Sequence, residues 1–326
     1  DQHILFAAAL LHDVEKRSTT STEIIDGVER IVSPKHAKKG ELTVRTFLYQ
    51  ELDTPFEIRE QIARLVRLHG LPLWAIEKED PRKAVIEASL LVNTRLLALL
   101  TRADVLGRIC DDQQELLLRV DLFVELCQEH GCFGKPYEFK SDYGRFLYLN
   151  KPDTAPDYKP YEDHECCVYV MCALPGTGKD TYVKKHLDMP VLSLDDIRRA
   201  NKIDPNDKKA QGWVIQEGKE QAKVHLRKKT SFVFNATNLT VDRRSKWISL
   251  FLEYRARVKI IYLEVPYKRL LSQNHNRAQK VPENVVRRMI RSLEIPVPRE
   301  AHEVEYVVEE INHTDLQAGR RFSKRG

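Results

Sequence analysis

The residues with the clearest chemistry form a glycine-rich loop, Leu174-Pro175-Gly176-Thr177-Gly178-Lys179-Asp180-Thr181. Such a loop cradles phosphate oxygens with backbone N–H groups when a strand precedes it and a helix follows. The apolar run 167–172 and the segment from Tyr182 meet both conditions. We therefore expect Lys179 to reach the β- and γ-phosphates of a nucleoside triphosphate bound with Mg²⁺. The nucleotide-binding residues would be Pro175, Gly176, Thr177, Gly178, Lys179, Asp180 and Thr181. The alternative is a turn that only closes a strand–helix unit.

Charged side chains farther along the chain suit phosphoryl transfer. Asp195 and Arg198 follow a short apolar run, and ligands of parallel sheets bind at the carboxyl ends of strands. A carboxylate there can accept the proton of an attacking hydroxyl, although Asp195 could instead only cap the following helix. Arg277 can stabilise charge on the transferred phosphoryl group, or it is merely a solvated surface residue.

These elements resemble the kinase domain of phage-type polynucleotide 5′-hydroxyl kinases. That family combines G-x-P-G-x-G-K, D-D-x-R and D-x-T-N elements with lid arginines, and the resemblance covers roughly residues 166–308. It implies that Asp195 is the general base on the 5′-hydroxyl. It also implies that Arg198 contacts the acceptor's phosphate and that Arg277, with Lys179, clamps the donor phosphates.

Four positions depart from these patterns. Ala173 stands where the first loop glycine is expected, and Asp180 stands where a Ser or Thr hydroxyl usually binds magnesium. An Asp there could bind Mg²⁺ directly or through water, but it also brings negative charge near phosphate. Asn235 replaces the Asp of the D-x-T-N element, and Gln273 stands where the family can place a second lid arginine.

A second set of reactive side chains lies in the first half of the chain. His12 and Asp13 end an apolar helical pattern, and His36, His69 and Asp104 follow in order. Histidine nitrogen and aspartate oxygen together suit a divalent metal. One His-Asp pair alone is weak evidence, and His36 alone could be a solvated histidine in a basic stretch. The ordered set favours a metal site.

This set resembles the HD phosphohydrolase superfamily, an all-α fold with the pattern H…HD…H…H…D. The resemblance covers about residues 1–128 and implies one or two divalent transition metals, such as Mn²⁺. A water activated as hydroxide would then attack a phosphoester. Lys16 matches a basic residue that holds substrate phosphate. His3 is too close to His12 to be the first histidine, which we expect upstream of this sequence.

The hydrophobic pattern divides the 326 residues into two classes of structure. Apolar residues recur at helical spacing in the first part, for example over 58–68 and 84–100, which predicts an all-α domain. Short β-prone runs alternate with helical segments in the second part, which predicts an α/β domain with a parallel sheet. The expected ranges are 1–130 for the metal-dependent domain, 131–165 for a linker with one packed stretch, 166–310 for the kinase domain and 311–326 for a mobile tail.

Composition narrows the class of protein only mildly. The net charge of +5 permits a polyanionic substrate without demanding one. No apolar run approaches the roughly 20 residues that span a bilayer, so no membrane partner is expected. The six cysteines form no C-x-x-C pair, which argues against a zinc ribbon and indicates reduced thiols in a cytoplasmic protein.

The two halves together resemble the bacterial HD-Pnk enzymes of RNA end healing. RNA broken by transesterification carries a 2′,3′-cyclic phosphate and a 5′-hydroxyl, whereas a ligase needs a 3′-hydroxyl and a 5′-phosphate. The resemblance implies that one half removes the first phosphate and the other adds the second to RNA or DNA ends. ATP or GTP as donor, RNA or DNA preference and oligomeric state have no sequence signal. Two alternatives stay open: an HD nucleotidase joined to a metabolite kinase, and an HD hydrolase regulated by bound nucleotide.

Overall fold

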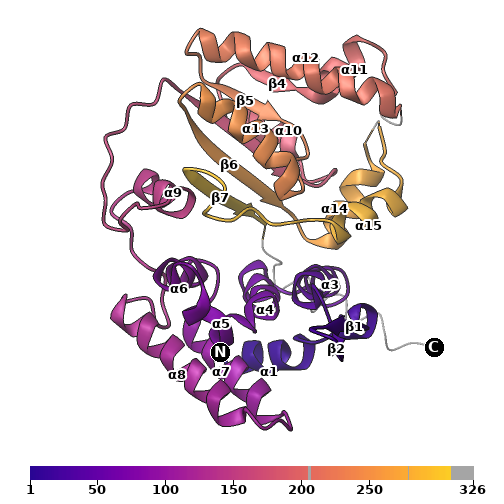
Figure 1. Cartoon of the computed structure of the whole chain (residues 1–326). Coiled ribbons are helices and arrows are strands. Elements are labelled where there is room, and N and C mark those ends of the chain that lie inside the picture. Colours follow the sequence, from indigo (N-terminus) through magenta and orange to yellow (C-terminus); the bar gives the residue numbers. More distant parts are fainter. Residues whose placement is uncertain (205–206, 278, 310–326) are drawn as a thin grey trace, which may run out of the picture. The chain divides into compact units, whose positions relative to one another are not determined.

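The computed structural model describes residues 1–204, 207–277 and 279–309, except the side chain of Lys208. The tail expected over 311–326 lies outside the described residues. The chain divides into two compact units, Asp1–Glu138 and Phe139–Gly326, called unit 1 and unit 2 below (Figure 1). The linker expected over 131–165 is divided between them, and its packed stretch is helix α9 (Asp142–Asn150) of unit 2.

Unit 1 is built mainly from helices, as expected. Helix α3 packs on α4, and α1 packs against both α4 and α7. The helical pattern over 84–100 is broken into two helices, because the Asn93 side chain caps α7 by accepting the N–H groups of Arg95 and Leu96. The helices are α1 (Gln2–Leu11), α2 (Lys16–Thr19), α3 (His36–Gln50), α4 (Phe56–Leu68), α5 (Leu71–Trp74), η1 (Ala75–Glu77), α6 (Pro81–Ser89), α7 (Thr94–Leu106) and α8 (Gln113–Glu129).

The expectation of an all-helical unit missed a two-stranded hairpin. Strand β1 (Ser21–Ile25) pairs antiparallel with β2 (Val28–Val32) through a turn at Asp26 and Gly27. Both turn residues have positive φ, 53° and 76°, which an Asp-Gly pair accepts readily. Almost every side chain of the two strands is exposed, so the hairpin has no buried apolar face whose periodicity could reveal it.

Unit 2 contains a five-stranded sheet in the order β4-β5-β3-β6-β7, with every neighbouring pair parallel. This confirms the predicted α/β fold with a parallel sheet. The strands are β3 (Cys166–Ala173), β4 (Val191–Ser193), β5 (Phe232–Asn235), β6 (Ala256–Glu264) and β7 (Glu303–Val308). The helices besides α9 are α10 (Lys179–His186), α11 (Leu194–Ala200), α12 (Lys208–Arg227), α13 (Val241–Glu253), α14 (Tyr267–His275) and α15 (Glu283–Arg291).

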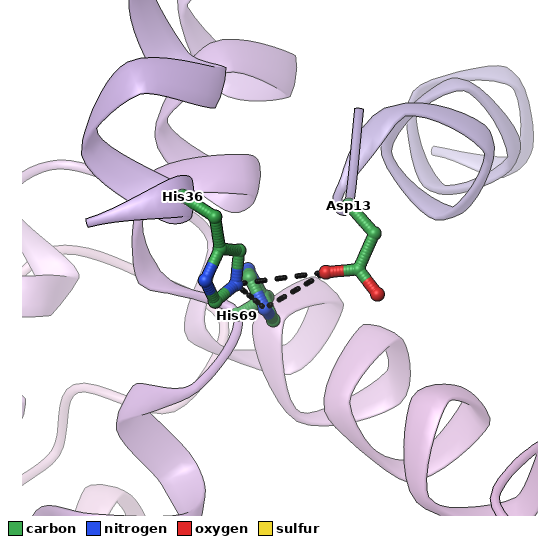
Figure 2. A group of neighbouring side chains, drawn as sticks. All are labelled: Asp13, His36 and His69. Atoms are coloured by element: carbon green, nitrogen blue, oxygen red, sulfur yellow. Dashed lines mark hydrogen bonds and ion pairs between the residues drawn. The ribbon is translucent and has the colours of Figure 1, made fainter. Parts of the chain in front are cut away.

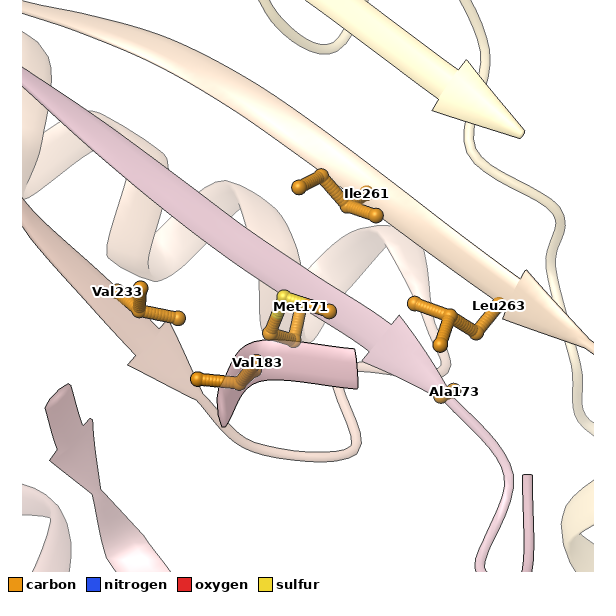
Figure 3. Close-up of a cluster of buried hydrophobic side chains, with 6 residues drawn as sticks. All are labelled: Met171, Ala173, Val183, Val233, Ile261 and Leu263. Atoms are coloured by element: carbon orange, nitrogen blue, oxygen red, sulfur yellow. The ribbon is translucent and has the colours of Figure 1, made fainter. Parts of the chain in front are cut away.

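Helices cover both faces of this sheet. Successive strand residues point to opposite sides, so each face has apolar side chains that must be buried. On one face Val183 of α10 packs among buried side chains of three strands: Met171, Ala173, Val233, Ile261 and Leu263 (Figure 3). On the other face Phe234 lies against Trp247 of α13, with ring centroids 4.2 Å apart. Strand β3 is the central strand of the sheet. After β3 the chain continues to β4, on one side of β3, whereas β6 and β7 lie on the other side. The loop after β3 therefore lies at a topological switch point, where ligands of such sheets bind.

Two sequence expectations concern the whole chain. All six cysteines are free, and four of them are buried. Among the described residues no single helix is both long and apolar enough to cross a membrane, and α6 and α7, which reach the needed length only together, meet at 109°.

Candidate functional sites

The glycine-rich loop connects β3 to α10. Gly176 and Gly178 have φ of 95° and 83°, in the left-handed region that favours glycine. The Thr177 side chain is buried and its hydroxyl donates to the carbonyl of Leu174 at 3.0 Å, which closes the loop on itself. Helix α10 starts at Lys179, so the N–H groups of its first turn are available to an anion at the loop.

Lys179, Asp180 and Asn235 form one hydrogen-bonded group. Lys179 Nζ lies 3.1 Å from Asp180 Oδ1 and also donates to Asn235 Oδ1. Asn235 Nδ2 donates to Asp180 Oδ1 at 2.9 Å. Burial opposes ionisation of Asp180, but the hydrogen bond from Asn235 and the charges of Lys179 and Arg277 lower its pKa. Asp180 is therefore a carboxylate held by hydrogen bonds from Lys179 and Asn235.

Asp195 and Arg198 lie at the same edge of the sheet as Asn235. Ser193, the last residue of β4, is in register with Asn235. Ser193 also caps α11, since its Oγ accepts a first-turn N–H at 3.2 Å, so Asp195 is free of that role. The Asp195 carboxylate instead accepts from Arg198 Nη1 at 2.5 Å, while Arg198 Nε donates to Gln211 at 2.8 Å. Sequence reasoning missed Gln211, which no motif marked.

Helix α14 closes against the glycine-rich loop. With its amide oriented to satisfy both neighbours, Gln273 donates to the carbonyl of Gly176 and accepts from Arg269 Nε at 2.9 Å. A Cβ on Gly176 would lie 2.9 Å from the Leu270 carbonyl oxygen, so the contact requires glycine. Arg277 follows α14 with an exposed side chain.

In unit 1 the five predicted ligands converge at one cavity of about 1130 Å³. His12 and Asp13 follow α1, His36 begins α3, His69 follows α4 and Asp104 lies in α7. Asp13 Oδ1 lies 3.5 Å from His36 Nε2 and 4.0 Å from His69 Nε2, and the two nitrogens are 3.4 Å apart (Figure 2). Four of the five predicted ligands line the cavity, and the fifth, His69, is buried.

Asp13 also belongs to a second group. Its Oδ2 lies 3.2 Å from His12 Nε2, which in turn lies 3.5 Å from Asp104 Oδ1. In each group the ligand atoms lie within 4.8 Å of one another. The two oxygens of one carboxylate thus face two sets of candidate metal ligands.

The three histidines turn their Nε2 atoms to these groups for a common reason. Each Nδ1 lies 2.7–2.8 Å from the backbone carbonyl three residues earlier. A carbonyl oxygen can only accept, so a neutral ring carries its proton on Nδ1 and presents the Nε2 lone pair. Backbone carbonyls orient metal-binding histidines in the same way. The lone pairs of His36 and His69 then face each other, which favours a cation between them.

Two buried atoms of the cluster lack hydrogen-bond partners among the described residues, His12 Nε2 and Asp13 Oδ1. The nearby carboxylates of Asp104 and Asp13 raise the pKa of His12 to about 10. That shift means that the carboxylates attract a positive charge at this nitrogen, whether a proton or a metal ion. The donor set and its unpartnered atoms fit a divalent metal.

Two basic side chains flank the cluster on the cavity wall. Lys16 Nζ lies 2.7 Å from Asp13 Oδ2, and Arg108 Nε lies 3.3 Å from Asp104 Oδ1. Arg108 was not among the predicted site residues. No motif marks it, because it lies just beyond the end of α7 at Leu106 and reaches the cavity only through the packing of that helix.

Comparison with known proteins bears mainly on unit 2. Residues 168–296 match the family model described as an AAA domain. The matched residues make up less than half of the chain. L-seryl-tRNA(Sec) kinase of Methanococcus maripaludis is 27% identical over 136 residues, covering 39% of this chain and 52% of that protein. The chain thus spans about half the length of this relative.

Two solved structures match part of the chain at lower identity. A candidate kinase from Chloroflexus aurantiacus is 16% identical, with 48% of this chain and 98% of that chain covered at a TM-score of 0.38. A chain of the Pnkp1/Rnl/Hen1 complex is 17% identical, with 38% of this chain and 43% of that chain covered at a TM-score of 0.33. Both TM-scores are low, so the sequence matches carry the classification. Unit 2 is an α/β P-loop domain with a parallel sheet and a kinase relative.

Proposed function

We propose that unit 2 transfers the γ-phosphoryl group of a nucleoside triphosphate to the 5′-hydroxyl of an RNA or DNA end. The observation that carries this is the position of Asn235, which bonds to Lys179 and lies in register with Ser193. Asp195 follows two residues after Ser193. The lysine that would contact the donor phosphates and the carboxylate on the acceptor side therefore share one edge of the sheet. The relative named as an L-seryl-tRNA(Sec) kinase supports an acceptor hydroxyl carried on RNA.

The residues divide the work of phosphoryl transfer between them. Asp195 accepts the proton of the 5′-hydroxyl as its oxygen attacks the γ-phosphorus, and the bond to the β-phosphate oxygen breaks to release the diphosphate. Arg198, oriented by Asp195 and Gln211, contacts the phosphate next to the acceptor. Lys179 and Arg277 neutralise charge that develops on the transferred group.

Asp180 and Asn235 supply the oxygen ligands on the magnesium side of the site. The usual pattern has a hydroxyl after the loop lysine, and the polynucleotide kinase pattern has a carboxylate at position 235. Here the carboxylate stands in the loop and the amide at the strand end, 2.9 Å apart. Carboxylate and amide oxygens both suit Mg²⁺, which when bound neutralises the β- and γ-phosphates.

Asp195→Asn tests the assignment, and Asp196→Asn is the matched control. Asp196 is the neighbouring exposed carboxylate and pairs with Arg199 rather than Arg198. We expect Asp195→Asn to lower kcat on a 5′-hydroxyl oligonucleotide by about 10²–10⁴-fold. The dissociation constant for the triphosphate should stay unchanged, and Asp196→Asn should behave as wild type. An Asp195→Asn enzyme with the wild-type rate would exclude the base assignment.

The choice of acceptor separates this function from its competitors. Oligonucleotides with a 5′-hydroxyl, free nucleosides and seryl-tRNA are compared at several salt concentrations. A KM that rises steeply with salt indicates a polynucleotide, since phosphate contacts weaken as salt increases. The seryl-tRNA arm tests a second candidate function, which the tRNA kinase relative favours. Phosphorylation of free nucleosides alone would favour a metabolite kinase, and nucleotide binding without transfer would favour a regulatory loop.

We further propose that unit 1 hydrolyses the 2′,3′-cyclic phosphate or 2′-phosphate of an RNA end. The observation that carries this is Asp13, whose two carboxylate oxygens face the two ligand groups. Among the described residues neither Asp13 Oδ1 nor His12 Nε2 has a hydrogen-bond partner. One or two divalent transition metals held there, such as Mn²⁺, would supply a water activated as hydroxide. Lys16 and Arg108 hold the substrate phosphate beside the cluster. Together the two units would heal both ends of a broken RNA.

Asp13→Asn tests this second activity, with His3→Ala as control. His3 lies on α1 with an exposed side chain, outside the cluster. With Mn²⁺ added, wild type and His3→Ala should convert a 2′,3′-cyclic phosphate end, whereas Asp13→Asn should not. Equal rates for Asp13→Asn and wild type would contradict the site. Cleavage of mononucleotides but not of oligonucleotide ends would favour a nucleotidase.

A further inference from the structure

The cavity of unit 1 has an apolar wall beside its charged cluster. Trp74, the last residue of α5, and Ile31 of strand β2 both line it. Their side chains are 48% and 79% exposed. Large apolar groups exposed at a cavity are a feature of ligand sites, because solvated surfaces usually scatter them singly.

The Trp74 ring is held in place from outside the cavity. The Arg119 guanidinium carbon lies over the ring, 4.9 Å from its centroid. Arg119 is itself fixed, donating to the Leu73 carbonyl at 3.1 Å and to the carboxylates of Glu77 and Glu115. Arg119 does not line the cavity, whereas Trp74 does. The indole is therefore a braced flat surface that forms part of the cavity wall.

We propose that this wall is a nucleobase subsite, in which the base next to the scissile phosphoester stacks on Trp74 and contacts Ile31. The inference rests on the proposed hydrolysis of an RNA end in unit 1, and it names the group that selects the substrate. Stacking on aromatic rings is how proteins commonly hold unpaired bases. Lys16 and Arg108 line the same cavity, so one nucleotide meets cations at its phosphate and an apolar wall at its base.

The cavity is large enough to admit a nucleotide at a strand end. Its volume of about 1130 Å³ is at the upper end of the roughly 300–1,000 Å³ of typical small-ligand pockets. A stacking surface also accepts any of the four bases, as an enzyme acting on random RNA breaks requires.

The test compares dinucleotides that end in a 2′,3′-cyclic phosphate, with or without the terminal base. Both carry a 5′-phosphate, so neither offers a 5′-hydroxyl to unit 2. Dissociation constants are measured by calorimetry with the full chain in EDTA, and KM for phosphate-ring opening is then measured with Mn²⁺. The variants are Trp74→Ala, Trp74→Phe and Ile31→Thr. Trp213→Ala is the matched control, since Trp213 is equally exposed at 47% but lies on α12.

For the base-bearing dinucleotide we expect Trp74→Ala to raise the dissociation constant and KM by about 5- to 150-fold. Trp74→Phe should stay within about threefold because a ring remains, and Ile31→Thr should give a smaller loss than Trp74→Ala. The dinucleotide without the base should bind all variants equally, and Trp213→Ala should match wild type. Equal binding of the base-bearing dinucleotide by wild type and Trp74→Ala would overturn the subsite. An equal loss for both dinucleotides would also overturn it, because Trp74 would then only shape the cavity.

The proposed hydrolysis can fail separately from the subsite. If wild type opens neither dinucleotide with Mn²⁺, the hydrolytic function is wrong. The binding contrast between Trp74→Ala and wild type in EDTA still decides whether a base stacks there.

Discussion

Asn235 Nδ2 donates to Asp180 Oδ1 at 2.9 Å, which joins the end of β5 to the first turn of α10. Each of these residues departs from its expected pattern in the opposite sense, one by losing a carboxylate and the other by gaining one. Their contact leaves one carboxylate in the pair. We infer that the two departures, which look unrelated along the sequence, are a single exchange in space.

This exchange predicts that the two positions compensate each other. Asp180→Thr removes the only carboxylate of the pair, and Asn235→Asp places two beside each other, so each should lower kcat at limiting Mg²⁺ by about 10- to 100-fold. The double variant Asp180→Thr/Asn235→Asp restores one hydroxyl and one carboxylate and should recover to within about tenfold of wild type. The measurement is kcat and half-saturating Mg²⁺ for 5′-phosphorylation, with triphosphate affinity as the readout of folding. A double variant as impaired as the product of the two single effects would rule out compensation.

The two left-handed glycines of the loop should respond differently to alanine. A Cβ on Gly178 would meet nothing within 4 Å, whereas one on Gly176 would lie 2.9 Å from the Leu270 carbonyl oxygen. Gly178→Ala should therefore cost only the backbone strain, about 1 kcal/mol in the free energy of unfolding. Gly176→Ala should cost more, about 2–4 kcal/mol, and should weaken triphosphate binding by displacing α14. Chemical denaturation of the two variants decides this, and equal losses would show that α14 does not press on the loop.

Much of the fold was readable because pattern and packing agree. The β-prone run over 167–172 lies in β3, and the helical spacing over 58–68 lies in α4. The hairpin at Ser21–Val32 escaped because its side chains face solvent and carry no period, although Asp26-Gly27 was a usable turn signal.

Some residues of the candidate sites could be predicted from the sequence, and others could not. Motif spacing led to His12, Asp13, His36, His69 and Asp104, which the structure brings together around one cavity. Trp74 and Arg108 could not be found by motif, because their place at the cavity depends on how α5 and α7 pack. The bond between Asn235 and Asp180 joins residues 55 positions apart, and only strand order brings them together.

Metal binding should stabilise unit 1 measurably. At a Mn²⁺ concentration of 100 times its dissociation constant, a site present only in the folded state adds about 2.7 kcal/mol, or roughly 10 °C in Tm. His69→Ala removes one ligand of the Asp13–His36–His69 group and should reduce that rise. His3→Ala should keep it in full. Thermal unfolding in EDTA and in Mn²⁺ gives the comparison, and the same rise in His69→Ala as in wild type would remove His69 from the site.

The stability of unit 2 should fall in mild acid because of His302. This side chain is 1% exposed, and its Nδ1 accepts the N–H of Val258 at 3.0 Å, so the proton is on Nε2, which lies 3.1 Å from His164 Nε2. Burial, with the charges of His164 and Arg257, lowers the pKa of His302 to about 3. The unfolded state takes up a proton near pH 6.5 that the folded state refuses until about pH 3. The stabilisation is therefore complete above pH 6.5 and is lost as pH falls from there toward 3.

Between pH 6.5 and 5 this histidine alone should lower the free energy of unfolding by about 2 kcal/mol. His302→Asn keeps an acceptor for the Val258 N–H but cannot titrate, so its stability should fall less over the same interval. His275→Asn, at an exposed histidine on α14, is the control and should follow wild type. The measurement is urea denaturation of unit 2 at both pH values. If His302→Asn and wild type lose stability equally, His302 is already protonated in the folded protein or plays no part in its acid response.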